Sequence, residues 1–240
     1  MPSLLTTDLD GPVALVTLQR PEKRNALSIE LRLELGDALG RMAGEDGVRC
    51  VVLTGAGSAF CSGIDTTQLG GETANRRRLL DSTRVAFGAA TRFPKPLLAA
   101  VNGPALGGGF ALALHCDLRL AARSARFGFA ELARGIPPSY ASALAALPEP
   151  LARELCLTGR ELDAEHAHAA GLVAEVVEDG QVVPRTLELA HQVAARPLET
   201  LLEVKRRFVL AAELARGRLQ ADEEHVLRRA LAGEEPEPAP

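Results

Sequence analysis

The sequence predicts an α/β fold in which short buried strands alternate with helices. Residues 13–18 are rich in branched apolar side chains, as in a β-strand. Ser28 then opens a predicted helix of about four turns, because leucines recur along one side at positions 27, 31, 35 and 39. Residues 48–53 form a second apolar strand. This strand–helix–strand order predicts a parallel pair joined by a crossover.

The rest of the chain continues the alternation up to a long helical end. The predicted elements are, in order, a polar helix at 66–92, a strand at 97–101, a helix at 107–116 that starts in a glycine run, strands at 118–121, 126–129 and 173–177 with helices between them, and a helical region at 182–231. Residues 233–240 are acidic and proline-rich, which predicts a disordered tail.

Composition bounds the classes of function. The chain has 240 residues, 47% hydrophobic and 24% charged, which suits one globular α/β unit. A net charge of −4 argues against nucleic acid as a partner, because phosphate binding needs a basic face. The four cysteines have no metal-like spacing, which predicts free thiols and no metal site. Neither a signal peptide nor a membrane-spanning apolar run is visible, so a cytoplasmic location without membrane contact is expected.

Two glycine-containing segments are the most informative motifs for the chemistry of this protein. Residues 59–65 read Ala-Phe-Cys-Ser-Gly-Ile-Asp, and residues 102–109 read Asn-Gly-Pro-Ala-Leu-Gly-Gly-Gly. The preceding segment 55–60 imitates a dinucleotide fingerprint, but Phe60 stands where the third glycine is needed. No Gly-Lys-Ser/Thr follows either segment, which excludes a phosphate-binding P-loop.

Together with Arg-Pro-Glu-Lys-Arg-Asn-Ala-Leu at 20–27, these segments resemble the enoyl-CoA hydratase/isomerase, or crotonase, family over about residues 10–180. The resemblance implies a crotonase-like spiral of repeated ββα units at 1–181. It also implies a C-terminal helical region at 182–232 that mediates trimers or dimers of trimers, followed by the tail at 233–240. The implied partner is an acyl-CoA thioester, with coenzyme A as part of the substrate and no other cofactor.

The family's two loops each direct one backbone N–H at the thioester oxygen, and the resemblance assigns these donors to Ile64 and Gly108. Negative charge develops on that oxygen when a proton leaves the neighbouring carbon, so two fixed donors stabilise the enolate. The resemblance also assigns CoA contacts to Arg24, Ala26 and Ser62. A guanidinium suits phosphate because its N–H groups donate parallel hydrogen bonds, although a solvated turn arginine is the alternative for Arg24.

Hydratases of this family generally use two glutamates, and only one of them has a counterpart here. The first would stand three residues after Gly108, where this chain has Ala111; the second aligns with Glu131 in Arg-Phe-Gly-Phe-Ala-Glu at 126–131. Alanine cannot hold water or transfer a proton, so efficient hydration is disfavoured. A 1,3-shift of a double bond needs only one carboxylate. The resemblance therefore favours an enoyl-CoA isomerase with Glu131 as its base.

A third segment differs from the family pattern. Where the family has Pro-Gly-x-Gly-Gly, residues 138–142 read Pro-Ser-Tyr-Ala-Ser. An aspartate at the place of Ser139 is the nucleophile of family dehalogenases, and its absence disfavours that chemistry. Ala111, Ser139 and Tyr140 are assigned to the acyl pocket, which the larger residues would reshape. Tyr140 either donates a hydrogen bond there or simply packs.

Two alternatives to an isomerase stay open at this point. One is a hydratase that has recruited Asp65 or Tyr140 in place of the missing acid, although capping the next helix is the simpler role for Asp65. The other is a catalytically weak acyl-CoA binding protein. His115 is expected in the core, and two histidines two residues apart, His166 and His168, diverge on a helix and make a poor metal pair.

Overall fold

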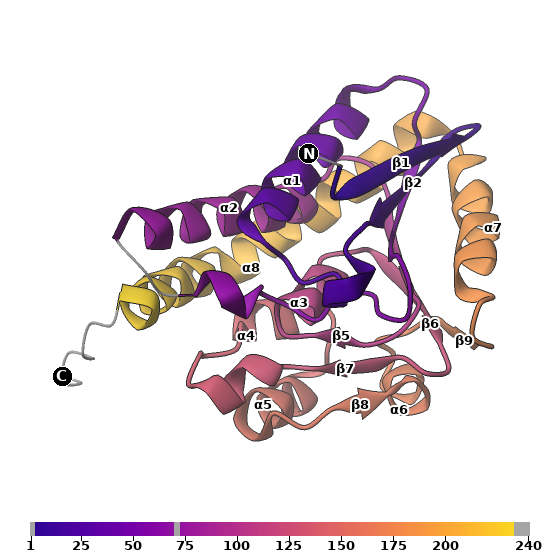
Figure 1. The fold of residues 1–240 in the computed structure, drawn as a ribbon. Helices are drawn as coiled ribbons and strands as arrows, with labels where there is room; N and C mark the ends of the chain where they lie inside the picture. The colour runs from indigo at the N-terminus through magenta and orange to yellow at the C-terminus, as the bar shows by residue number, and fades with distance from the viewer. Residues whose placement is uncertain (1–2, 70–72, 233–240) are drawn as a thin grey trace.

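The computed structural model describes residues 3–69 and 73–232 and confirms the α/β spiral (Figure 1). A six-stranded sheet has the order β1-β2-β3-β4-β6-β9, and a three-stranded sheet has the order β5-β7-β8. The strands are β1 (Leu5–Asp10), β2 (Val13–Leu18), β3 (Cys50–Gly55), β4 (Leu97–Val101), β5 (Ala105–Leu106), β6 (Leu118–Ala122), β7 (Arg126–Gly128), β8 (Leu162–Asp163) and β9 (Glu175–Val177).

Helices join these strands. They are η1 (Pro21–Lys23), α1 (Ile29–Gly44), η2 (Thr66–Gln68), α2 (Thr73–Thr91), α3 (Gly108–Leu114), η3 (Ala130–Arg134), α4 (Tyr140–Ala143), α5 (Glu149–Thr158), α6 (Ala164–Ala169), α7 (Val182–Ala194) and α8 (Leu198–Ala232), where η marks a 3-10 helix.

The predicted crossover is confirmed. β2 and β3 pair in parallel, and α1 connects them after Ser28, whose side chain caps the helix by accepting the Leu31 N–H at 3.2 Å. The strand predicted at 48–53 is β3, two residues further along. β1 pairs antiparallel with β2 across Gly11. It was not predicted from the sequence, because most of its residues are polar and most are exposed.

The spiral arises because the chain visits both sheets in each turn. β4 belongs to the large sheet and β5 to the small one, and α3 follows; β6 and β7 repeat this order before η3. Apolar side chains from both sheets and from α1, α2 and α3 fill the main core. The helices after β5 and β7 therefore begin side by side, and these two helix starts carry the glycine run and Glu131.

The C-terminal region divides into two helices around Pro197, which cannot continue a helix. α7 packs Val182, Ala190 and Ala194 against the outer face of the large sheet, to the right in Figure 1. α8 runs back past α2 toward the other end of the molecule. The oligomerisation role of residues 182–232 stays a prediction, and the predicted disordered tail lies outside the described residues. No helix within residues 3–69 and 73–232 is long and apolar enough to cross a bilayer.

Candidate active site

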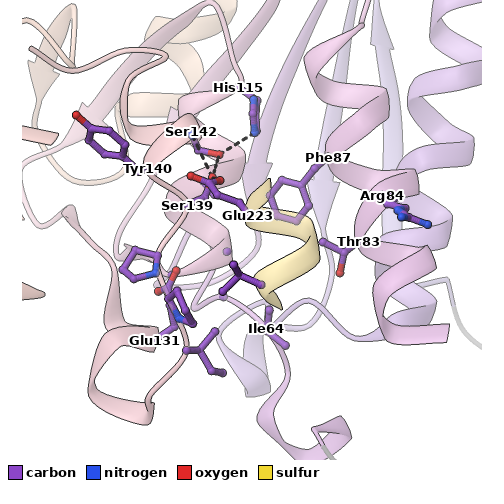
Figure 2. Close-up of a pocket in the computed structure, with 18 of the residues that line it drawn as sticks. Ile64, Thr83, Arg84, Phe87, His115, Glu131, Ser139, Tyr140, Ser142 and Glu223 are labelled. Atoms are coloured by element: carbon purple, nitrogen blue, oxygen red, sulfur yellow. Dashed lines mark hydrogen bonds between the residues drawn. The ribbon is translucent and has the colours of Figure 1, made fainter. Parts of the chain in front are cut away.

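A cavity of about 750 Å³ lies where the starts of α3 and η3 meet α2, α4 and the end of α8 (Figure 2). Its wall includes every residue that the resemblance assigns to the oxyanion donors, the base and the acyl pocket. These residues are Ile64, Gly108, Ala111, Glu131, Ser139 and Tyr140. The spiral thus gathers into one site side chains that are up to 76 positions apart in sequence.

Ile64, in the loop before η2, lines this cavity. Leu27 holds the loop on both sides of Ile64: its N–H donates to the Gly63 carbonyl at 2.7 Å, and its carbonyl accepts the Asp65 N–H at 3.2 Å. The Ile64 N–H has no acceptor among the backbone hydrogen bonds of the described chain. It is therefore available to a ligand.

Gly108, to which the resemblance assigns the second N–H donor, stands at the first turn of α3. Gly108 is the first residue of that helix, so its N–H has no acceptor within the helix. A β-carbon on Gly108 would lie 3.6 Å from the Ile64 nitrogen, which brings the two backbone segments into direct contact. The N–H groups of Ile64 and Gly108 thus adjoin one another, and the dipole of α3 adds positive potential at the same place.

Glycine is required for this approach. A β-carbon on Gly109 would lie only 2.1 Å from the Cys61 carbonyl oxygen, so no other residue fits between the two loops. Gly107 has a φ of +53°, in the region that residues with a side chain rarely adopt. The glycine run is therefore explained by the contact between the loops.

Glu131 lies in η3, directly after the strand that pairs with β5. Burial raises the pKa of its carboxyl group to about 7. A hydrogen bond between the carboxyl group and the backbone N–H of Glu131 itself lowers the pKa, but by less than burial raises it. Its Oε2 atom is buried and has no hydrogen-bond partner among the described residues. A carboxylate with this pKa can exchange protons near neutral pH.

Ala111 stands where the resemblance expects the first of the two glutamates. It follows Gly108 by one turn of α3, lines the cavity and is 7% exposed. The place where the family's first glutamate stands thus faces the cavity and carries only a methyl group. Among the described residues that line the cavity, Glu131 is the carboxylate that adjoins the glycine run, and Asp222 and Glu223 line the cavity from α8.

Asp65 and Tyr140 are both engaged elsewhere. Asp65 forms an ion pair with Arg20 at 2.8 Å and caps η2 through the Thr67 N–H. Burial acts to raise its pKa, but the hydrogen bonds from Thr67 and Arg20 prevail and lower it. It is therefore a helix cap, as the simpler prediction had it.

Tyr140 lines the cavity, but its hydroxyl is directed away from the reacting end (Figure 2). That hydroxyl accepts from Arg153 Nε at 3.3 Å and lies 3.5 Å from Glu149 Oε1, on the outside of α5. The aromatic ring packs against the main core. Of the two interpretations of Tyr140, packing is the one that this geometry supports.

Of the three residues assigned to CoA, Ser62 lines the cavity, and Arg24 and Ala26 lie outside its lining. The Ser62 N–H donates to the Arg24 carbonyl at 2.9 Å, and the Ala26 carbonyl accepts from Arg20. Arg24 is exposed, with a left-handed backbone (φ +49°) at the end of η1.

Two cavity residues were missed by the sequence analysis. His115 was expected in the core, yet it lines the cavity; its position four residues after Ala111 puts it on the same helix face, which is a signal that could have identified it. Glu223 reaches the cavity from α8. No sequence pattern identifies Glu223, because its position depends on the course of a 35-residue helix.

The other candidate residues contribute no site. Burial raises the pKa of the Cys61 thiol to about 12, so it is a poor nucleophile. His166 bonds to Asp163 and His168 to the Val173 carbonyl. Within the described ranges, no three histidine, cysteine or carboxylate side chains are grouped so that they could hold a metal ion.

Comparison with known proteins agrees with this geometry. Residues 8–235 match the family model of enoyl-CoA hydratase/isomerase. Enoyl-CoA hydratase EchA19 of Mycobacterium tuberculosis is 38% identical over 192 residues, which cover 77% of this chain and 72% of the relative.

Two solved structures are similar along most of the chain. An enoyl-CoA hydratase/isomerase from Mycobacterium paratuberculosis superposes with a TM-score of 0.90 at 25% identity, covering 96% of this chain and 94% of that one. A monofunctional enoyl-CoA isomerase from M. smegmatis superposes with a TM-score of 0.74 at 33% identity, covering 88% and 95%. With its spiral fold and these matches, the chain belongs to the enoyl-CoA hydratase/isomerase family.

Proposed function

We propose that this protein isomerises the double bond of an enoyl-CoA, converting a 3-enoyl to a 2-enoyl thioester. The observation that carries the proposal is a single carboxylate, Glu131, beside the two backbone donors, with Ala111 where a second acid would stand. Hydration needs groups that hold and deprotonate water, whereas isomerisation needs one base that removes a proton and returns it.

In this reaction Glu131 removes a proton from C2 of the bound thioester. The electron pair moves into a dienolate, and the N–H groups of Ile64 and Gly108 stabilise the negative charge on the thioester oxygen. Glu131 then returns the proton to C4, and the double bond ends between C2 and C3. Typical contributions are about 10²–10⁴ in rate for the acid–base group and about 10²–10³ for each oxyanion donor.

Coenzyme A enters as part of the substrate, and the reaction as proposed uses no other cofactor. Arg24 contacts a CoA phosphate, and the backbone beside Ala26 and Ser62 receives the pantetheine arm. The exposure of Arg24 and the hydrogen bond of its carbonyl to Ser62, which lines the cavity, support the first assignment. Ala111, Ser139 and the ring of Tyr140 line the space for the acyl group.

Enoyl-CoA hydration is the second candidate, and the hydratase names of several relatives favour it. It would need another group in place of the missing acid. Asp65 and Tyr140 are bound to Arg20 and Arg153, so Glu223 is the remaining glutamate of the cavity wall. A binding protein without chemistry is disfavoured by the raised pKa of Glu131, since an exposed carboxylate would titrate near its ordinary value.

Product analysis in deuterated water separates these functions. The purified protein is incubated with a 3-enoyl-CoA and, separately, with a 2-enoyl-CoA, and the products are identified by mass spectrometry. Conversion of the 3-enoyl to the 2-enoyl isomer without the mass gain of water supports isomerisation. Formation of 3-hydroxyacyl-CoA would favour hydration, and tight binding without conversion would favour the binding protein.

The Glu131→Gln variant tests the base directly. We expect turnover to fall by about 10²–10⁴ while affinity for a saturated acyl-CoA is retained. Glu165→Gln is the matched control, because Glu165 is an exposed glutamate paired with Arg123. Full activity in Glu131→Gln would refute the assignment of Glu131.

A trimer or a dimer of trimers is proposed for the assembly. Large apolar side chains on α8 support it, because they are exposed in the single chain: Val204, Phe208, Leu210 and Leu214. Light scattering coupled to size-exclusion chromatography should give a mass of three or six chains. A monomer at micromolar concentration would refute it.

A further inference from the structure

A continuous row of polar side chains lines the cavity away from Glu131 (Figure 2). We call it the polar relay; its members are Thr91, His115, Ser142, Ser139 and Glu223. Thr91 Oγ1 lies 3.1 Å from His115 Nδ1, and His115 Nε2 lies 3.2 Å from Ser142 Oγ. Ser139 Oγ lies 2.8 Å both from Ser142 Oγ and from Glu223 Oε2.

His115, at one end of the polar relay, lies far from the oxyanion donors. Gly108 begins α3 and His115 caps its end, so the rise of the helix separates them by roughly 10 Å. Ala111 of α3 and Phe87 of α2 contribute apolar side chains to the cavity wall. A group that touches the polar relay is therefore carried on the acyl chain several carbons beyond the double bond.

Hydrogen-bonding capacity is left over in the polar relay. Glu223 Oε1 accepts the Ala141 N–H at 2.7 Å, and Oε2 accepts the Ser139 hydroxyl. The backbone N–H of Tyr140 also interacts with this carboxylate. Two carboxylate oxygens can accept about four hydrogen bonds, so capacity for one further donor remains. Burial raises the pKa of Glu223, and the hydrogen bonds from Ala141, Ser139 and Tyr140 offset this only in part. A further donor from a ligand would compensate the lost solvation.

We propose that the acyl group of the substrate carries a hydroxyl group that binds the polar relay. The hydroxyl donates to the Glu223 carboxylate, which an aliphatic chain cannot do. A purely hydrocarbon chain would remove water from the carboxylate without replacing its hydrogen bonds, which is unfavourable. Sites built around a buried polar group discriminate strongly against ligands that lack its partner. This inference rests on the proposed function, since it assumes an acyl-CoA substrate.

Glu223 also has a structural role, because it attaches α8 to the start of α4 through Ala141 and Ser139. The test therefore needs a variant that spares this attachment. Ser142→Ala removes a relay hydroxyl but leaves both contacts of Glu223 intact. Glu223→Gln keeps the size of the side chain and an oxygen that can accept the Ala141 N–H. Thr66→Ala is the control, because Thr66 lines the cavity outside the polar relay.

The experiment measures dissociation constants by calorimetry for pairs of saturated acyl-CoA thioesters. Each pair has one ω-hydroxyacyl-CoA and the unsubstituted acyl-CoA of equal length, with chains of about six to ten carbons to match the helical separation. In the unaltered protein we expect the hydroxylated member of at least one pair to bind at least about tenfold more tightly. Ser142→Ala and Glu223→Gln should reduce this preference below about threefold, and Thr66→Ala should retain it.

Three outcomes would overturn the inference. They are equal affinity within every pair, an unchanged preference in both relay variants, and an equal loss of affinity for both members of a pair, which would assign the polar relay a structural role. Thermal unfolding of each variant checks that it is folded. Turnover of unsubstituted 3-enoyl-CoA, measured in parallel, tests the proposed function separately: its absence with a retained hydroxyl preference would refute isomerisation but not the polar relay.

Discussion

The carboxylate of Glu131 rests on the backbone of Gly107. Its Oε2 atom lies 2.8 Å from the point where a β-carbon on residue 107 would stand. Gly107 immediately precedes Gly108, whose N–H is one of the two donors assigned to the oxyanion. Glu131 and Gly108 are therefore close neighbours in the structure. The absence of a side chain at position 107 leaves the space that the Glu131 carboxylate occupies.

Gly107→Ala should displace this carboxylate. Gly11→Ala is the matched control, because Gly11 has a similar φ (+55° against +53°) but nothing within 4 Å of its would-be β-carbon. Both variants should lose about 1–3 kcal/mol in the free energy of unfolding, because a residue with a side chain is strained at a positive φ. Only Gly107→Ala should lose about 10² in kcat/KM, because a shift of about 1 Å in a reacting group has that effect. Equal activity in the two variants would contradict this account.

The raised pKa of Glu131 predicts the pH dependence of the reaction. The base must be ionised to accept a proton, and its pKa is about 7 instead of the ordinary 4.5. We expect kcat/KM to fall about tenfold per pH unit below 7 and to be nearly constant above it, since this parameter reports the free enzyme. Initial rates between pH 5 and 9 measure the profile. Constant kcat/KM from pH 5 to 7 would mean that Glu131 titrates as an exposed glutamate.

The raised pKa of Glu131 also makes the free energy of unfolding depend on pH. Because burial raises the pKa of Glu131 in the folded state, the folded state binds the proton more tightly than the unfolded state. The free energy of unfolding therefore decreases as pH rises from 4.5 to about 7, by up to ~3 kcal/mol, and stays lower above that. Glu131→Gln lacks this loss.

Urea unfolding of the two proteins at pH 4.5 and pH 8 measures this difference. We expect the stability of Glu131→Gln relative to the unaltered protein to be greater at pH 8 than at pH 4.5. A relative stability that does not change between these pH values would mean that the carboxyl group is as well solvated in the folded state as in the unfolded one.

Arg32 predicts a large effect on stability away from the cavity. Its buried guanidinium donates to the Leu27 carbonyl from Nε at 3.0 Å and from Nη2 at 2.6 Å, and to the Leu79 carbonyl at 2.9 Å. Arg32→Met removes these donors, while the Leu27 carbonyl keeps the Asp65 N–H and the Leu79 carbonyl keeps the Ser82 and Thr83 hydroxyls. Because hydrogen bonds that involve a charged group contribute about 1.5–3 kcal/mol, we expect a loss of that order in the free energy of unfolding. Arg41→Met on the exposed side of the same helix is the control.

Denaturant unfolding of both arginine variants checks this expectation. Because Leu27 also holds the loop of Ile64 in position, Arg32→Met should in addition lower kcat, and Arg41→Met should not. A loss of stability that is equal in the two variants would show that the hydrogen bonds of Arg32 contribute little.

Much of the fold and half of the site could be predicted from local sequence. The strands at 13–18 and 97–101 and the cap at Ser28 match the structure, because each depends on neighbouring residues alone. Ile64, Gly108 and Glu131 were assigned through motifs, and the structure brings all three to one cavity. The strand at 5–10 escaped prediction because its side chains are mostly exposed.

The sequence by itself determined the family, the glycine loops and the loss of the first acid at Ala111, since each is a matter of which residue stands at which position of a motif. Only the tertiary structure decided what the other polar groups do. Asp65 forms an ion pair with Arg20, and the Tyr140 hydroxyl accepts a hydrogen bond from Arg153. Glu223 lines the cavity and accepts a hydrogen bond from the Ser139 hydroxyl. The physical reason is that these contacts join residues brought together by packing of separate helices, and no local pattern specifies that packing.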